Sequence, residues 1–119
     1  QLKVYDYFNP TDLSIENSKD VANMGFSYNT AGNNLKLLVN LKGNSNYVDN
    51  YDNVRNIFEH EKTHYCDFRK NGVDNYRKMS RIKKEQNAIN TQMRHKSWKN
   101  TSQDFKDGVI RYGKRIGIN

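Results

Sequence analysis

The sequence predicts an α+β fold in which a small sheet from the N-terminal half packs on two or three helices from the C-terminal half. Residues 25–30 and 35–41 are short, contain several apolar residues and flank a turn-rich stretch, which is typical of a β-hairpin. Residues 51–70 and 75–95 instead repeat apolar side chains at helical spacing over longer stretches. The sheet is therefore expected to be antiparallel or mixed and to precede the helices along the chain.

The N-terminal half contains the expected hairpin and three segments with weaker patterns. Residues 31–34, between the two hairpin strands, read Ala-Gly-Asn-Asn, and Gly and Asn are residues that favour tight turns. The weaker segments are an alternating strand over residues 2–8, a short helix within residues 9–23 and a polar loop over residues 43–50.

The first long helix is expected over residues 51–70. Asp49 or Asn50 can cap its start, and Asn71-Gly72 supplies the stop expected just past a helix C-terminus. Neither Pro nor Gly interrupts the segment. Its apolar positions form one buried stripe, made of Val54, Ile57, Phe58, Tyr65 and Phe68.

Within this helix, residues 60–64 read His-Glu-Lys-Thr-His, an H-E-x-x-H motif. Residues four apart project from one face of a helix, so His60 and His64 can both offer an imidazole nitrogen to one tetrahedral Zn²⁺. Glu61 lies on the neighbouring flank, where its carboxylate can take a proton from a water that attacks a polarised carbonyl. The motif predicts a zinc hydrolase, and the alternative is a charged, solvated helix face.

A catalytic zinc usually has three protein ligands, and Glu85 is the best candidate for the third. It lies on the apolar side of the second predicted helix, residues 75–95, and is the only acidic residue between Asp74 and Asp104. A lone carboxylate on an inward side needs a partner such as a metal or an arginine. The small Ala88, one turn later, would allow the two helices to approach closely. A surface pair of Glu85 with a lysine or arginine is the alternative.

The H-E-x-x-H motif followed by Glu85-x-x-Ala88 resembles the gluzincin arrangement of the zincin-like metallopeptidases. More narrowly, residues 57–118 resemble the small metallopeptidase toxin domains at the C-termini of large bacterial secreted proteins of the Rhs and polymorphic-toxin kind. The matching residues are the run from His60 to Phe68, then Glu85, Ala88, Trp98, Phe105, Tyr112 and Gly113.

This resemblance implies a minimal zincin-like fold that acts as a zinc endopeptidase. It assigns His60, His64 and Glu85 as the Zn²⁺ ligands and Glu61 as the general base. It also implies that the hairpin supplies the strand edge to which an extended peptide substrate adds. The natural partner of such a toxin would be an acidic immunity or inhibitor protein that plugs the cleft.

The residue that stabilises the oxyanion has no clear match in the resemblance. Tyr112 and His95 both have a suitable donor, and Tyr112 is ranked ahead, although a core tyrosine and a surface histidine are the simpler interpretations. Asp67 is expected either to orient a ligand histidine or to replace the third ligand. Cys66 is expected to point away from the metal face. The third helical stretch, residues 97–114, is expected to cover the back of the two-helix core, although Gly108 weakens it.

Charge divides the chain into an acidic first half and a basic second half. Residues 1–53 carry a net charge of −2 and residues 54–119 a net charge of +9, which gives +7 for the whole chain. Basic surfaces attract nucleic acid, anionic membranes or acidic proteins. The basic run over residues 77–84 makes nucleic-acid binding the competing function, but no nucleic-acid fold signature or phosphate-binding loop accompanies it.

Three alternatives to a peptidase therefore stay open. The chain could be a zinc-dependent amide hydrolase that acts on a cell-wall substrate, or a zincin scaffold that binds without turnover. It could also be a basic nucleic-acid-binding module with an inactive H-E-x-x-H motif. Assays with protein, peptidoglycan and nucleic acid would separate these possibilities.

Length and composition indicate one domain that spans residues 1–119. A single cysteine excludes an intramolecular disulfide. No apolar stretch approaches the ~18 residues of a membrane span, and no signal peptide is expected within this chain. Because it begins with Gln1, we expect a piece of a larger protein that is secreted or delivered into a target cell.

Overall fold

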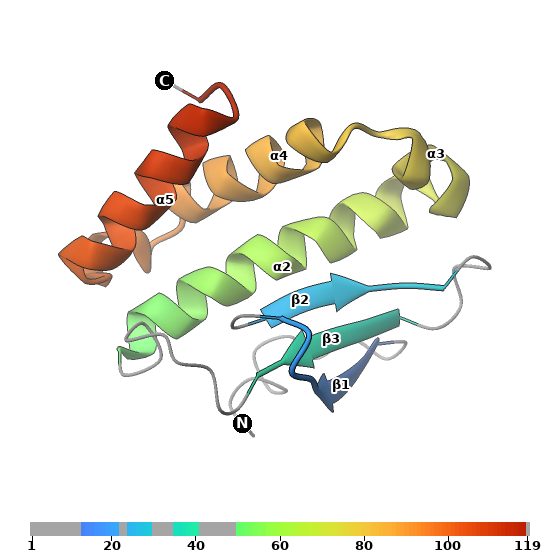
Figure 1. Cartoon of the computed structure of the whole chain (residues 1–119), viewed down its shortest axis with the longest axis horizontal. Coiled ribbons are helices and arrows are strands. Elements are labelled where there is room, and N and C mark those ends of the chain that lie inside the picture. Colours follow the sequence, from blue (N-terminus) through green and yellow to red (C-terminus); the bar gives the residue numbers. More distant parts are fainter. Residues whose placement is uncertain (1–12, 22–23, 30–34, 41–49, 119) are drawn as a thin grey trace.

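The computed structural model describes residues 13–21, 24–29, 35–40 and 50–118. Within them the predicted α+β class is confirmed: a small mixed sheet lies on one side of the long helix α2, and α4 and α5 lie on the other (Figure 1). The described elements are β1 (Leu13–Asn17), β2 (Met24–Ser27), β3 (Leu35–Val39), α2 (Tyr51–Asn71), α3 (Val73–Lys78), α4 (Arg81–Arg94), the 3₁₀ helix η2 (Trp98–Asn100) and α5 (Gln103–Arg115).

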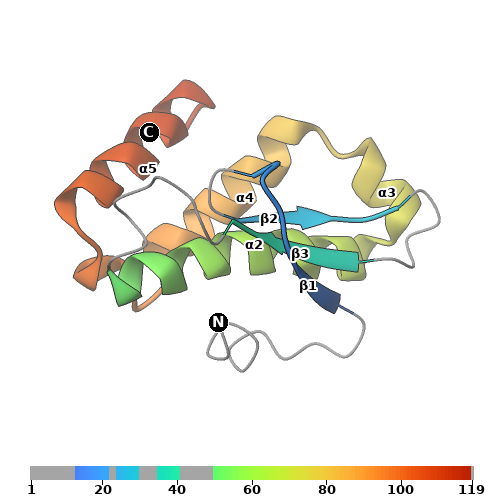
Figure 2. The same ribbon diagram turned by 60° about the horizontal axis from the view of Figure 1, so that its bottom comes forward.

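The strand order in the sheet is β1-β3-β2. β2 pairs with β3 in antiparallel register, Met24 opposite Val39, which confirms the predicted hairpin pairing. The hairpin turn, the strand expected over residues 2–8 and all of the expected polar loop except Asn50 lie outside the described residues. Because β3 is paired on both sides, the hairpin can offer an edge only through β2, which lies next to α2 (Figure 2).

The short helix expected within residues 9–23 is wrong, because the described part of this segment contains β1. The sequence of β1 is L-S-I-E-N, in which apolar and polar residues alternate with the period of a strand. Parallel pairing with β3, Leu13 opposite Leu35, satisfies the backbone groups of β1 that face β3, and Ile15 packs against the hydrophobic core. Tertiary pairing therefore decides the conformation of this short segment.

The core lies between the sheet and α2. Its buried side chains come from β3, α2 and α3, namely Leu35, Leu37, Phe58, Phe68 and Tyr76. The side chain of Asn50 caps α2 by accepting from the Asn53 N–H at 3.0 Å, as expected for one of the two predicted caps. The helix ends at Gly72, whose φ of 81° favours glycine. The predicted first helix is thus confirmed with both of its ends.

The predicted second helix is interrupted, so that α3 and α4 replace one helix over residues 75–95. Met79 is extended, with a ψ of 139°, and the Ser80 hydroxyl accepts from the Lys83 N–H at 3.0 Å. A serine that caps a new helix start favours a break over continuation. As a result, α4 takes its own direction and packs along α2.

The third predicted stretch divides into η2 and α5, and α5 starts after the capping residue Ser102. The expected placement of this stretch on the back of the two-helix core is wrong. Residues of α5 line the same cavity as His60 and Glu61, so α5 forms one wall of the candidate site. No helix in the described ranges combines the length and the apolar character needed to cross a membrane.

Candidate metal centre

Helix α2 carries the H-E-x-x-H motif near its middle. The ring centroids of His60 and His64 lie 4.8 Å apart, as the four-residue spacing on one helix face requires. Glu61 and His64 are buried, with 7% and 8% of their surfaces exposed. The fold therefore encloses the motif. The alternative interpretation of these residues as a charged, solvated helix face does not hold.

Helix α4 brings Glu85 to the two histidines. Its Oε2 lies 2.7 Å from His64 Nε2, and its Oε1 lies 3.4 Å from His60 Nε2. The potential ligand atoms of the three residues all lie within 4.8 Å of one another, so the group could hold a metal ion. Two imidazole nitrogens and one carboxylate oxygen are also the donor set of one class of catalytic zinc site.

His60 and Glu85 each shift the pKa of the other. Burial alone would raise the pKa of Glu85, but hydrogen bonds from His60 and His64 and their charges outweigh it and hold this pKa well below its usual range. Burial would likewise lower the pKa of His60, but the contacts and charges of Glu85 and Glu61 raise it. Glu85 therefore stays ionised, as a metal-binding carboxylate must.

Two buried amides, which the sequence analysis missed, support His60. Gln92 Oε1 of α4 lies 2.6 Å from His60 Nδ1, and Gln92 Nε2 donates to Asn56 Oδ1 of α2 at 3.1 Å. Asn56 precedes His60 by one turn of α2, and Gln92 follows Glu85 by two turns of α4. This helical spacing was the available signal, because it places each amide on the face of its helix that carries a site residue.

Glu61 lies between the histidines and the sheet. Burial raises the pKa of its carboxyl, and the charges of His60 and His64 partly offset the rise. The Glu61 carboxyl also accepts a hydrogen bond from the backbone N–H of Phe26 in β2, which lowers this pKa. A carboxylate whose pKa lies above its ordinary value is a stronger proton acceptor, as suits a general base.

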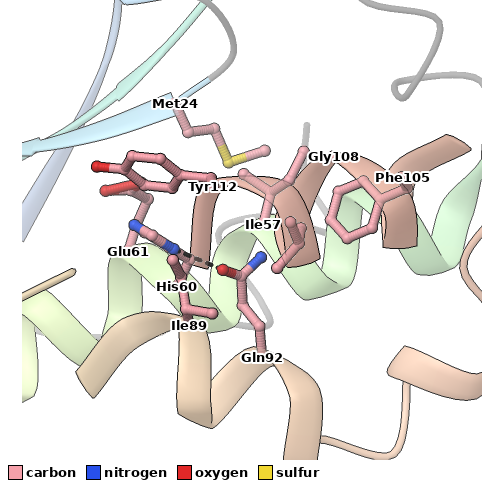
Figure 3. A pocket seen from close by; sticks show the side chains of 10 residues that line it. Met24, Ile57, His60, Glu61, Ile89, Gln92, Phe105, Gly108 and Tyr112 are labelled. Atoms are coloured by element: carbon pink, nitrogen blue, oxygen red, sulfur yellow. Dashed lines mark hydrogen bonds between the residues drawn. The ribbon is translucent and has the colours of Figure 1, made fainter. Parts of the chain in front are cut away.

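A cavity of about 310 Å³ opens beside these residues. Figure 3 shows Tyr112 of α5 close to Glu61 and His60, with Phe105 and Ile57 towards the other end. The cavity is lined by Met24, Ile57, His60, Glu61, Ile89, Gln92, Phe105, Gly108, Val109 and Tyr112. Apolar side chains therefore form most of the wall, and the groups able to do chemistry gather in one part of it.

Tyr112 lies at the site and is not a buried core tyrosine. Its hydroxyl donates a hydrogen bond of 3.2 Å to Glu85 Oε1. Burial, with the charge and hydrogen bond of Glu85, raises the pKa of this hydroxyl. Tyr112 therefore keeps its proton at neutral pH and can act as a hydrogen-bond donor.

Three other predicted residues lie away from the converging group. Asp67 Oδ2 accepts a hydrogen bond of 3.2 Å from Asn87 Nδ2, and no described contact joins Asp67 to His60 or His64. Among the described residues, His64 Nδ1 is buried with no hydrogen-bond partner. His95 contacts Glu59 and Ser97 and is not a wall residue of the cavity. Cys66 is exposed.

Comparison with known protein families gives a match over most of the chain. Residues 13–116 match the family described as metallopeptidase toxin 2. No curated protein and no solved structure gives a significant match to the chain. The family match covers both the sheet and the helices, including all three residues of the converging group.

Proposed function

Because the chain belongs to the metallopeptidase toxin 2 family, we propose that it is a zinc-dependent endopeptidase with His60, His64 and Glu85 as the metal ligands. The observation that carries the proposal is the convergence of these three side chains from α2 and α4 within 4.8 Å. A His₂Glu donor set leaves a fourth position for water or substrate in tetrahedral zinc sites. The family name indicates a metallopeptidase, and the donor set favours zinc.

Bound zinc would polarise the scissile carbonyl and activate the attacking water. Glu61 takes a proton as the water oxygen bonds to the carbonyl carbon, and it returns this proton to the leaving amine as the C–N bond breaks. Tyr112 is proposed to donate a hydrogen bond to the oxyanion. Its position beside Glu85 and its raised pKa support this role.

The edge of β2 is the proposed binding site for the peptide backbone. Because the Phe26 backbone contacts Glu61, the backbone groups of Phe26 face away from β3, and those of Met24 face the same way. The Phe26 N–H is paired with Glu61, so an extended peptide would add to β2 through the Phe26 carbonyl and the backbone groups of Met24. N-methylation of the peptide backbone removes such hydrogen bonds, so an N-methylated substrate that is cleaved as fast as its parent would overturn this assignment.

The proposed setting is a bacterial toxin that is secreted or delivered into a target cell as part of a larger protein, with a cell protein as substrate. Exposed basic side chains of α3 and α4, namely Arg77, Lys78, Arg81 and Lys83, support an acidic immunity protein as a partner. Salt should weaken such a complex, because exposed charges are screened. An affinity that is independent of salt would argue against this charge-based recognition.

The test of the proposed function combines zinc analysis with cleavage of protein and peptide substrates. Glu61→Gln should keep about one equivalent of zinc, because Glu61 is not a ligand, and should lose about 10²–10⁴-fold in cleavage rate. Glu59→Gln is the matched control, since Glu59 lies on the same helix and is equally buried, at 8% exposed. The control should retain cleavage.

Retained cleavage in Glu61→Gln would overturn the mechanism, and absence of zinc from the wild-type protein would overturn the site. His64→Ala and Glu85→Ala should each bind zinc much more weakly, and a chelator should lower the melting temperature of the wild-type protein. If peptidoglycan or nucleic acid were processed and peptides were not, the corresponding alternative would replace the peptidase.

A further inference from the structure

We propose that Gln92 and Asn56 are positioning residues that hold the His60 imidazole with a proton on Nδ1 and so direct Nε2 towards the metal site. This inference rests on the proposed function, because it assigns a role at the same metal site. It names two residues outside the H-E-x-x-H motif and outside the ligand set.

The two amides are buried between α2 and α4. Asn56 is fully buried, and Gln92, at the cavity wall, is 4% exposed, so water has little access to their polar atoms. In such a place each donor must face an acceptor, because an unmatched buried polar group costs about 1–3 kcal/mol. The orientation of each group can therefore be worked out from its partners.

The backbone carbonyl of Gln92 determines the orientation of the Asn56 side-chain amide. This oxygen can only accept, and it lies 2.9 Å from the Asn56 amide, so the atom facing it must be the nitrogen Nδ2. The same nitrogen donates to Ser97 Oγ at 3.0 Å. Asn56 is thus held at two acceptors, and its Oδ1 must face the side chain of Gln92.

The orientation of Asn56 determines that of the Gln92 side-chain amide, which contacts His60. Asn56 Oδ1 is an acceptor 3.1 Å from the Gln92 amide, so the Gln92 atom there must be Nε2. Gln92 Oε1 consequently faces His60 Nδ1 at 2.6 Å and requires a proton on that ring nitrogen. Without a proton on Nδ1, two acceptors would face each other in a buried site.

The consequence for metal binding is that Gln92 occupies His60 Nδ1, so Nε2 is the ring nitrogen directed towards the metal site. His60 Nε2 lies 3.4 Å from Glu85 Oε1, on the side where the three ligand atoms converge. A partner on the other ring nitrogen fixes both the tautomer and the ring orientation of a metal-binding histidine. In the described part of the chain His64 Nδ1 has no such partner, so this amide pair acts on His60 alone.

The experiment measures the tautomer and zinc affinity separately. The chain contains three histidines, so ¹⁵N NMR of the imidazole rings can assign His60 in the zinc-free protein. Wild-type His60 should carry a proton on Nδ1. Gln92→Met should lose this signature and bind zinc about 10–100-fold more weakly.

Gln86→Met is the matched control. Gln86 is also on α4, and its side-chain amide makes one hydrogen bond of 2.7 Å, to the Ile116 carbonyl, without contacting His60. It should leave the tautomer unchanged and affect zinc affinity less than Gln92→Met. Equal losses in the two variants would overturn the positioning role.

A His60 Nδ1 that carries no proton in the zinc-free wild-type protein would overturn the inference without any variant, even if Gln92→Met failed to fold. A wild-type protein that takes up no zinc would instead overturn the proposed function. The two failures are distinguishable, because the tautomer is measured in the absence of metal.

Discussion

The hydroxyl of Tyr112 donates a hydrogen bond of 3.2 Å to Oε1 of Glu85, which joins α5 to the carboxylate that α4 supplies to the candidate metal centre. This contact places a neutral donor beside the converging side chains of His60, His64 and Glu85. It also defines two roles for the tyrosine that can be separated: it could hold Glu85 in place, or it could serve the reaction.

Tyr112→Phe separates these roles. If Tyr112 stabilises the oxyanion, the variant should lose about 10²-fold in kcat, as other sites do when one oxyanion donor is removed, with zinc affinity little changed. Steady-state kinetics on a peptide substrate and zinc titration provide the two readouts. Tyr51→Phe is the control, because Tyr51 lies on α2 with 59% of its surface exposed.

The opposite result would be a loss of zinc affinity with an unchanged kcat in zinc-saturated protein. The Tyr112 hydroxyl would then be an anchor for Glu85 and would have no part in the reaction. Tyr51→Phe should change neither readout, since Tyr51 does not line the cavity.

The sequence was most informative where the relevant contacts are local. The spacing of His60 and His64 determines their shared face within one helix, so their proximity follows from the helix period alone. Predicting that Glu85 joins the histidines required one further argument, namely that a lone carboxylate on an inward helix face needs a partner. The structure brings Glu85 to the histidines, at 2.7 Å from His64.

The features missed from the sequence depend on contacts between distant segments. Gln92 and Asn56 meet only because α4 packs along α2, and no pattern within either helix determines that crossing. The placement of α5 at the cavity has the same cause. The helix break before α4 is different, because Ser80 is a strong capping residue and its signal was present in the sequence.

The apolar wall of the cavity predicts which substrates fit. Met24, Ile57, Phe105 and Val109 line it next to His60 and Glu61, so peptides with an apolar side chain beside the scissile bond should be cleaved fastest. Val109→Phe should narrow the cavity and reduce kcat/KM for peptides with large apolar side chains. One methylene in an apolar pocket is worth about 1–3 kcal/mol, so a change of ten-fold or more is expected.

The adjacent residue provides the control. Ile110 is also on α5 but is 39% exposed and is not among the residues of the cavity wall, so Ile110→Phe should leave specificity unchanged. A peptide series that varies one side chain from Ala to Phe would measure the preference. Equal kcat/KM values across this series in the wild-type protein would contradict a specificity role for the cavity.

The packing of α5 against α4 predicts an effect on stability that is independent of catalysis. A Cβ at Gly113 would lie 3.6 Å from Ile89 Cγ2 and 3.6 Å from Ile118 Cβ, which are ordinary contact distances. Because glycine within a helix costs about 0.5–1 kcal/mol relative to alanine, Gly113→Ala should raise the free energy of unfolding by that amount.

Gly72→Ala is the contrasting variant for this measurement. Gly72 has a φ of 81° and a ψ of 162°, so a side chain there is strained although nothing lies within 4 Å of its Cβ position, and a loss of about 1–3 kcal/mol is expected. Urea unfolding at a fixed zinc concentration measures both variants. A destabilised Gly113→Ala would mean that α5 approaches α4 too closely for a methyl group, and the cavity wall that α5 forms would then tolerate little change.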